Sequence, residues 1–186
     1  MLALAEVVVP PLLAPRVVAG AGGLVVVEWA RAGGDRGLVG GLHGVGVSCV
    51  NALSTWLEAT VEKDGKKHFM EFRTGESVAP VKEIGTSSRQ GTTIRWKADP
   101  TIFTETTTYN FDVLCGRLRE LAFLNSGIKI YFRDERLSKP KEIPFQFEGG
   151  IKQFVTYLNE GKKVIPEVPV FISGERDDVH TEVSLQ

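Results

Sequence analysis

A glycine-rich segment that runs straight into an apolar stretch is the part of this chain whose residue types could do chemistry. It reads Gly40-Gly41-Leu42-His43-Gly44-Val45-Gly46 and continues as Val47-Ser48-Cys49-Val50-Asn51-Ala52-Leu53-Ser54. The first turn of a helix presents unpaired N–H groups and the positive end of the helix dipole, and glycines let an anion come close to the backbone. The pattern is therefore compatible with a phosphate-binding loop at the start of a helix.

Glycine spacing alone does not select a phosphate as the ligand. A glycine-rich turn that caps a buried helix is the simpler interpretation of the same residues. The segment also lacks the Lys-Ser/Thr ending of a P-loop, and neither a preceding strand nor a ribose-binding acid marks it as a dinucleotide fingerprint. The spacing therefore leaves two interpretations open.

Composition limits the classes of protein to which the chain can belong. With 186 residues, 42% hydrophobic residues, 24% charged residues and a net charge of -1, it is expected to build one sizeable soluble core. That charge does not favour DNA contact by this segment. Cysteine and histidine are too scattered to predict a disulfide framework or a metal site, so we expect reduced thiols in a cytoplasmic protein: Cys49, Cys115, His43, His68 and His180. Three prolines and Arg16 interrupt the apolar amino-terminal stretch, which excludes a membrane span there.

Periodicity predicts strands first and then a helix. Residues 57–61 and 68–72 alternate around Asp64-Gly65, which predicts a hairpin, and residues 92–96 predict a third strand. From Phe111 to Ala122 apolar residues recur at helical spacing, with Asn110 as the expected N-cap.

The remainder alternates between the two kinds of element. Residues 128–132 predict a strand, residues 151–158 a shorter helix, and residues 168–172 and 181–185 a hairpin joined across residues 174–178. Helices interspersed with hairpin-connected strands favour an α+β two-layer sandwich over a doubly wound parallel sheet.

Residues 1–39 differ in composition from everything that follows. They contain no Ser, Thr, Asn, Lys, Ile or Phe, and no sustained period, although residues 7–9 and 24–27 could form short strands. All of the favoured residue types have GC-rich codons. We therefore interpret residues 1–39 as an atypical leader, either non-native sequence from a shifted reading frame or a genuine flexible segment.

Several ordered motifs resemble one family. Residues 40–54 resemble the signature of the B subunits of bacterial DNA gyrase, which are type II DNA topoisomerases of the GHKL ATPase superfamily. Further segments agree in order and spacing: residues 90–96, 117–127, 147–151 and 182–186. The resemblance covers roughly residues 40–186, and several matches in order make a chance match improbable.

The resemblance implies a fold and a ligand. It implies an incomplete GHKL (Bergerat) ATPase sandwich over residues 40–166 and the first hairpin of a transducer domain over residues 167–186. It implies that the loop and helix start bind the phosphates of ATP, with Thr92 holding the adenine pocket and Lys63 at the pocket entrance, where the family usually has arginine. The residues so implied to bind the nucleotide are Gly40, Gly41, Leu42, His43, Gly44, Val45, Gly46 and Thr92.

The resemblance also implies partners and a reaction. In this family ATP and Mg²⁺ drive supercoiling and strand passage by a homodimer that works with the gyrase A subunit and DNA. The segment before Gly40 departs from the family pattern because it has no Glu-x-x-Asp-Asn helix, which carries the general base and the Mg²⁺ ligand, and no Asp-x-Gly-x-Gly-Ile turn, which reads adenine. No catalytic or metal-binding residue is therefore assigned, and hydrolysis by this chain is expected to be negligible. The alternatives are a nucleotide- or partner-binding fragment without turnover and the B subunit of topoisomerase IV.

Overall fold

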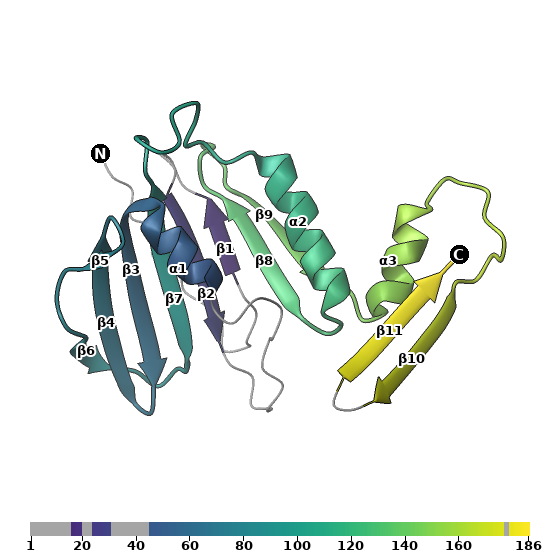
Figure 1. Ribbon diagram of the computed structural model, residues 1–186, viewed down its shortest axis with the longest axis horizontal. Helices are drawn as coiled ribbons and strands as arrows, with labels where there is room; N and C mark the ends of the chain where they lie inside the picture. The colour runs from purple at the N-terminus through teal and green to yellow at the C-terminus, as the bar shows by residue number, and fades with distance from the viewer. Residues whose placement is uncertain (1–15, 20–23, 31–44, 177–178) are drawn as a thin grey trace.

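The computed structural model describes residues 16–19, 24–30, 45–176 and 179–186. Figure 1 shows one broad sheet, with a separate hairpin beyond it at the carboxyl end. The strands are β1 (Arg16–Ala19), β2 (Leu24–Ala30), β3 (Ser54–Lys63), β4 (Lys66–Arg73), β5 (Glu76–Ser77), β6 (Lys82–Thr86), β7 (Gly91–Ala98), β8 (Lys129–Asp134), β9 (Lys141–Gln146), β10 (Val170–Arg176) and β11 (Val179–Leu185). The helices are α1 (Val45–Ala52), α2 (Phe111–Leu124) and α3 (Gly150–Leu158). None of these helices is both long and apolar enough to cross a membrane.

The large sheet has the order β5-β4-β3-β7-β2-β1-β8-β9, and β6 also pairs with β4. All of its pairings are antiparallel except that of β1 with β8. The predicted hairpin is confirmed: β3 and β4 pair from Trp56↔Arg73 to Lys63↔Lys66, and the two residues between them have φ values of 52° at Asp64 and 81° at Gly65. Two successive left-handed residues suit the right-handed twist of the flanking strands, and Asp-Gly is a preferred pair for such a turn.

The two faces of the central strands differ in polarity. Leu57 on β3 and Ile94 on β7 are buried, with 2% and 7% of their surfaces exposed. Side chains alternate along a strand, so the intervening positions point to the other face, where Glu58 and Arg95 form an ion pair of 3.6 Å between directly paired residues. This alternation makes one face of the sheet apolar and the other charged.

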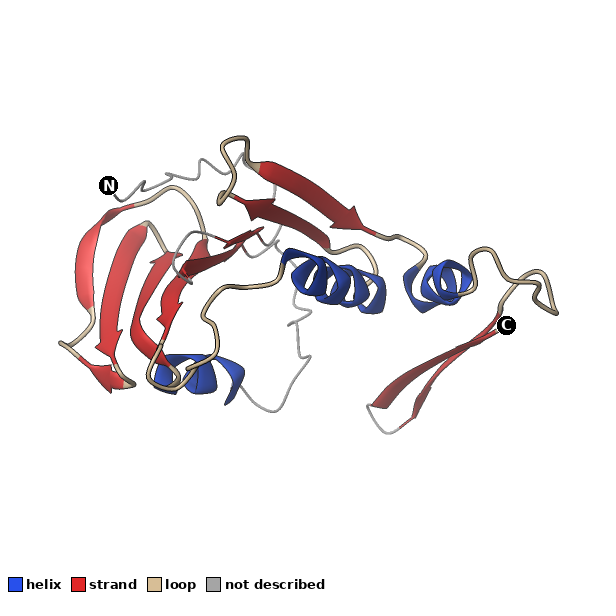
Figure 2. Cartoon of the chain, turned by 90° about the horizontal axis from the view of Figure 1, so that it is seen from above, coloured by secondary structure: helices blue, strands red, loops and turns tan. Residues whose placement is uncertain are grey.

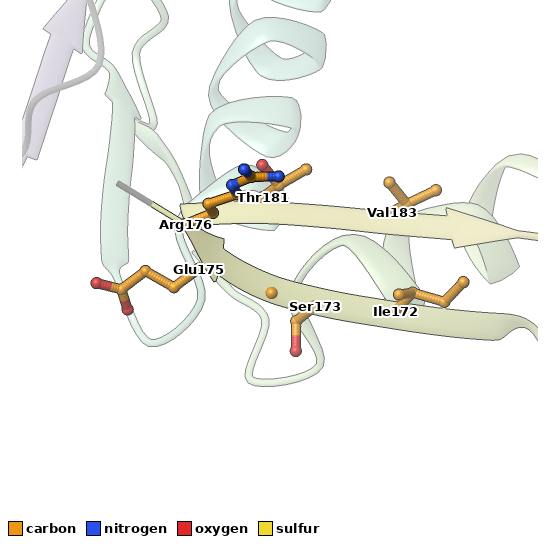
Figure 3. A pocket seen from close by; sticks show the side chains of 7 residues that line it. Ile172, Ser173, Glu175, Arg176, Thr181 and Val183 are labelled. Carbon is orange, nitrogen blue, oxygen red and sulfur yellow. The ribbon is translucent and has the colours of Figure 1, made fainter. Parts of the chain in front are cut away.

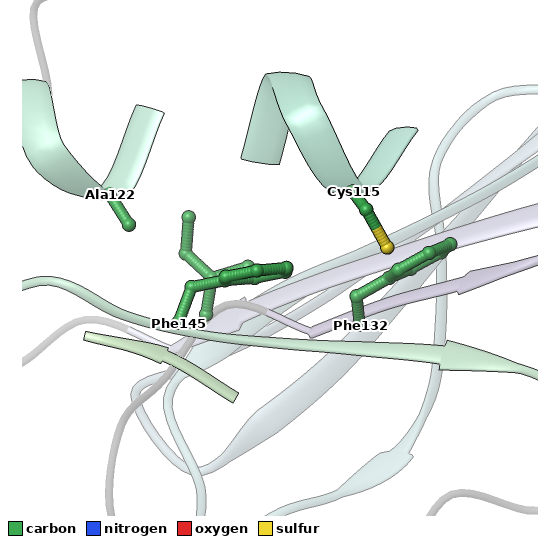
Figure 4. Packing of buried hydrophobic residues seen from close by; sticks show 5 residues of the cluster. Cys115, Ala122, Phe132 and Phe145 are labelled. Atoms are coloured by element: carbon green, nitrogen blue, oxygen red, sulfur yellow. The ribbon is translucent and has the colours of Figure 1, made fainter. Parts of the chain in front are cut away.

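Helix α2 covers the apolar face near the β8–β9 end of the sheet. Its predicted N-cap is confirmed, because the side chain of Asn110 accepts a hydrogen bond of 3.1 Å from the Val113 N–H. Figure 4 shows the buried cluster between this helix and the sheet, which comprises Cys115, Ala122, Ile130, Phe132 and Phe145. Figure 2 shows α1 and α2 on the same side of the sheet. The predicted two-layer α+β sandwich is confirmed.

Helix α3 joins this sandwich to the carboxyl-terminal hairpin. Phe123 on α2 stacks on Phe147 and Phe154, with ring centroids 3.6 and 5.0 Å apart, which fixes α3 against α2. Strands β10 and β11 form the predicted hairpin, but the prediction of its connection was too long. Gly174 is paired with Thr181 and Arg176 with Val179, so the strands extend through residues predicted as a connection. Glycine weakens a strand and is common in turns, which is why Gly174 indicated a turn.

Four of the described strands were not predicted from the sequence, and a fifth was given only as a possible strand. Residues 24–27, a possible strand, lie in β2, whereas β1, β5, β6 and β9 were not predicted. Pro144 lies inside β9, which is an edge strand, and proline is tolerated at sheet edges although it discourages a strand prediction. The possible strand at residues 7–9 lies outside the described residues.

An ion pair fixes the loop that precedes α2. Asp134, at the end of β8, is buried and accepts hydrogen bonds of 2.8 and 2.6 Å from the Arg136 guanidinium, whose third nitrogen donates to the Tyr109 carbonyl. The hydrogen bonds and charge of Arg136 hold the pKa of the Asp134 carboxyl below its ordinary value. The loop up to Tyr109 is thereby tied to the sheet.

Replacement of a core ring tests the packing of the sandwich. Because Phe132 has none of its surface exposed, Phe132→Ala should lower the free energy of unfolding by about 3–5 kcal/mol in urea titrations. Phe171→Ala is the control, since that ring on β10 is 43% exposed and its loss should cost less than about 1 kcal/mol. Equal losses for the two variants would contradict the assignment of the core.

Acid titration tests the Asp134–Arg136 pair. A lowered pKa contributes stability that is fully present above the unfolded-state value of about 3.9 and is lost as the pH falls through the folded-state value. Asp134→Asn removes this contribution. The difference in unfolding free energy between the two proteins should therefore be largest near neutral pH and shrink below about pH 4. Parallel stability curves down to about pH 2 would show that the pair does not stabilise the fold.

Candidate functional site

Helix α1 brings the end of the glycine-rich segment onto the sheet. The helix begins at Val45, and its last residue is followed by Leu53 and then β3. It contacts β3 and β7, over whose apolar face it lies in Figure 1. The backbone N–H of Asp99, just beyond β7, donates to the Leu53 carbonyl at 3.1 Å. The end of α1 is therefore fixed beside the Ala98 end of β7.

Thr92 lies at the other end of β7. It is half-buried and pairs with Val61 of β3 and with Trp29 of β2. Two-residue alternation puts Thr92 on the same face as the buried Ile94 and opposite to Arg95. The last turn of α1 lies beside the Ala98 end of β7. In Figure 1 the helix lies obliquely across the sheet, so its first turn lies toward the opposite end of β7, which carries Thr92.

No described side chain covers the first turn of α1. A Cβ built on Gly46 would have no described atom within 4 Å, and Val47, Ser48 and Cys49 are exposed. The first N–H groups of a helix have no partner within it, and the helix dipole makes this end positive. An anion could reach these groups without displacing a described side chain.

Lys63 is a cation that the register places on this face. It is exposed, it ends β3, and it lies two residues beyond Val61, the strand partner of Thr92. Residues two apart in a strand share a face, so Lys63 belongs to the same face as Thr92.

The structure describes only some of the predicted site residues. Val45 and Gly46 start α1 and Thr92 lies on the sheet that α1 covers, whereas five predicted residues lie outside the described ranges: Gly40, Gly41, Leu42, His43 and Gly44. Sequence reasoning assigned no role to Val61 or Ile94. Strand alternation from Thr92 would have found Ile94, whereas Val61 is placed beside Thr92 by the register of β3 with β7. It also assigned none to Asn51 and Ser54, which lie within the glycine-rich motif itself.

Metal binding finds no support in the described part of the chain. No three His, Cys, Asp or Glu side chains there lie close enough to hold a metal ion. A hollow of about 470 Å³ beside β10 and β11 also lies apart from the residues described above (Figure 3). Its lining residues include none of the predicted site residues: Ile172, Ser173, Gly174, Glu175, Arg176, Thr181 and Val183.

Known proteins resemble the chain in sequence. The DNA gyrase B subunit of Treponema denticola is 60% identical over 167 residues, which is 87% of this chain and 26% of the relative. The DNA gyrase B subunit of Treponema pallidum is 58% identical over 147 residues, covering 79% and 23%, and that of Bacillus cereus is 51% identical over 154 residues, covering 83% and 38%. The chain thus spans between about a quarter and two fifths of the length of these relatives. No family model matches it.

A solved structure resembles the chain in fold. It is the 43K ATPase domain of Thermus thermophilus gyrase B, crystallised in complex with an aminocoumarin, which matches with a TM-score of 0.77 and 31% sequence identity. The match covers 92% of this chain and 50% of that one. By sequence and by fold, the chain therefore belongs to the family of DNA gyrase B subunits and corresponds to part of their GHKL-type ATPase domain.

Proposed function

We propose that the chain contributes the phosphate-binding part of the ATP site of an ATP-hydrolysing type II DNA topoisomerase, in which nucleotide binding drives DNA supercoiling and strand passage by the whole protein. The observation that carries this proposal is the open first turn of α1, which follows the glycine-rich segment and lies over the face that holds Thr92. The sequence identity to gyrase B subunits supports the same assignment.

Each part of the site has a separate task in this proposal. Backbone N–H groups from Gly40 to Gly46 donate to the phosphate oxygens, where the helix dipole adds favourable charge. Thr92 orients the adenine from the sheet, and Lys63 offers one positive charge at the entrance, without the paired donors of an arginine. An aminocoumarin, the kind of ligand bound in the Thermus thermophilus structure, is a second probe to test on this chain.

Magnesium is implied by the family, but the described residues do not fit a site for it. They bring together no suitable set of carboxylates, and no asparagine precedes Asn51 in the sequence. The described residues support binding and orientation of the phosphates.

The partners of the whole protein also belong to the proposal. Homodimerisation, the gyrase A subunit and DNA are expected for gyrase B, in the cytoplasm. We propose a division into residues 1–39, an ATPase part of residues 40–166 and the start of a transducer domain at residues 167–186. Strands β1 and β2, within residues 1–39, pair with β8 and β7 and belong to the sheet of the ATPase part. The separate hairpin of β10 and β11, reached through α3, supports the last boundary.

A second candidate function is nucleotide or partner binding without turnover. The sequence feature that favours it is the lack of a Glu-x-x-Asp-Asn motif before Gly40, since hydrolysis needs a base to activate water. The B subunit of topoisomerase IV is the remaining alternative. The gyrase names of the relatives compared above favour gyrase over topoisomerase IV.

Two helical glycines allow a matched test of the phosphate site. A Cβ on Gly46 in α1 or on Gly116 in α2 would have no described atom within 4 Å. Alanine is the better helix former, so each Gly→Ala variant should keep or raise the free energy of unfolding, by up to about 1 kcal/mol. Gly46→Ala alone should weaken binding of the non-hydrolysable analogue ADPNP, about tenfold or more by calorimetry, because its methyl group occupies the phosphate approach. Equal ADPNP affinity in the two variants would refute the site.

The rate of phosphate release from ATP tests the second candidate function, binding without turnover. We expect this 186-residue chain to release phosphate from ATP no faster than its Gly44→Ala, Gly46→Ala double variant. The measurement is steady-state phosphate release with Mg²⁺ present, at an ATP concentration well above the Kd measured for ADPNP. Release clearly above the double variant would establish that the chain hydrolyses ATP and would remove the binding-only alternative.

A further inference from the structure

Apolar packing does not explain how α1 is held in place. Residues 46–49 of this helix are exposed, and Val50 and Asn51 are only half-buried. A helix of eight residues is too short to be stable by itself, and most helical stability in proteins comes from a packed apolar face. Within the part of the chain that the structure describes, contacts other than a buried apolar face must therefore fix the direction of α1 on the sheet.

Polar contacts gather at the end of α1. Ser54 Oγ donates a hydrogen bond of 2.6 Å to the Val50 carbonyl, and the Leu53 N–H donates to the Cys49 carbonyl at 3.0 Å. These bonds finish the helix locally. Asn51 reaches further, because its Nδ2 donates a hydrogen bond of 3.0 Å to the carbonyl of Gly75, 24 residues away in the chain.

The acceptor of this hydrogen bond lies in a tight turn. Thr74 and Gly75 connect β4 to β5 with φ values of 47° and 90°, and the strands pair on both sides of them through Arg73↔Glu76. Two consecutive left-handed residues between paired strands form a turn with little freedom. A Cβ on Gly75 would lie 3.5 Å from the Cα of Ala52, so this turn lies directly against the end of the helix.

The chemistry of the contact leaves one orientation for the Asn51 amide. A backbone carbonyl only accepts, so the NH₂ group must face Gly75. The Oδ1 atom is then buried and accepts no hydrogen bond from any residue in the described ranges. A buried acceptor without a partner is unfavourable. The hydrogen bond from Nδ2 to Gly75 is therefore the interaction that accounts for the buried position of the Asn51 amide.

We propose that Asn51 is a positioning residue for the phosphate site, because it anchors the last turn of α1 to the β4–β5 turn and thereby aims the first turn of the helix. The anchoring stands on the contacts above, and its consequence for nucleotide binding rests on the function proposed above. Eight residues at about 1.5 Å each make a lever of about 12 Å. A tilt of roughly 10° at the anchored end would move the first turn by about 2 Å, enough to break hydrogen bonds to a phosphate.

The test changes each side of the contact separately in the full 186-residue chain. Asn51→Leu keeps the size of the side chain and removes the donor. Gly75→Ala strains the turn that supplies the acceptor, and Gly65→Ala is its matched control. Gly65 has a φ of 81° in the equivalent position of the β3–β4 turn, but a Cβ there would have no described atom within 4 Å.

Two measurements test whether these substitutions loosen α1 and weaken nucleotide binding. Amide hydrogen exchange by NMR, without nucleotide, reports opening of α1 relative to β7, and calorimetry reports the Kd for ADPNP. Asn51→Leu and Gly75→Ala should raise exchange of the α1 amides about tenfold, the effect of one lost hydrogen bond, and leave β7 protected. Both should weaken ADPNP binding by about tenfold or more, whereas Gly65→Ala should change neither the α1 exchange relative to β7 nor the Kd.

Each outcome decides one part of the proposal. Unchanged α1 exchange in Asn51→Leu and Gly75→Ala would overturn the anchor. Faster α1 exchange with an unchanged Kd for ADPNP would overturn the positioning role and leave Asn51 as a structural residue. A third outcome is faster α1 exchange in the two variants together with no ADPNP binding by the unsubstituted chain. That outcome would confirm the anchor but refute the proposed function, and with it the role of Asn51 in positioning phosphates.

Discussion

The antiparallel pairing of β3 with β7 is the constraint on which the rest of the structure depends. It joins the β3–β4 hairpin to β2 and, through β2, to the strands packed under α2. Its register places Ala59 opposite Ile94 and Glu58 opposite Arg95. A shift of one residue would turn charged side chains toward the helices, so the two-faced pattern fixes the register strongly. Because α1 leads directly into β3, this register also fixes where the helix ends.

The two ends of α1 differ in how many contacts hold them, and this difference has a functional consequence. One end of α1 is tied to three neighbouring segments, at Ser54, at Gly75 and at Asp99, while no described side chain covers the other end. Preorganised backbone donors bind a charged ligand better than donors that must be ordered at the moment of binding, because the ordering cost is avoided. The fold therefore supplies rigidity at the end where no ligand is expected, and that rigidity is transmitted to the end where phosphate is proposed to bind.

Local patterns predicted much of this architecture because their physical causes are local. The Asp64-Gly65 turn, the Asn110 cap and the helical spacing from Phe111 each depend on residues close in sequence. The failures have two kinds of cause. Strand β1 is four residues long, and besides β2 it pairs with the distant β8, a pairing that no short window of sequence contains. Strand β9 contains Pro144, which discourages a strand prediction unless the strand is known to lie at a sheet edge.

The same distinction divides the glycine-rich motif. Its front half allows two interpretations from the sequence, a turn that caps a helix or a loop that lets a ligand approach backbone donors, because both uses of glycine are local. The meaning of Asn51 depends on the carbonyl of Gly75, whose position is set by the folding of β4 and β5. In the proposed site the two halves are complementary, because backbone donors at a helix end bind a phosphate better when the direction of that helix is fixed.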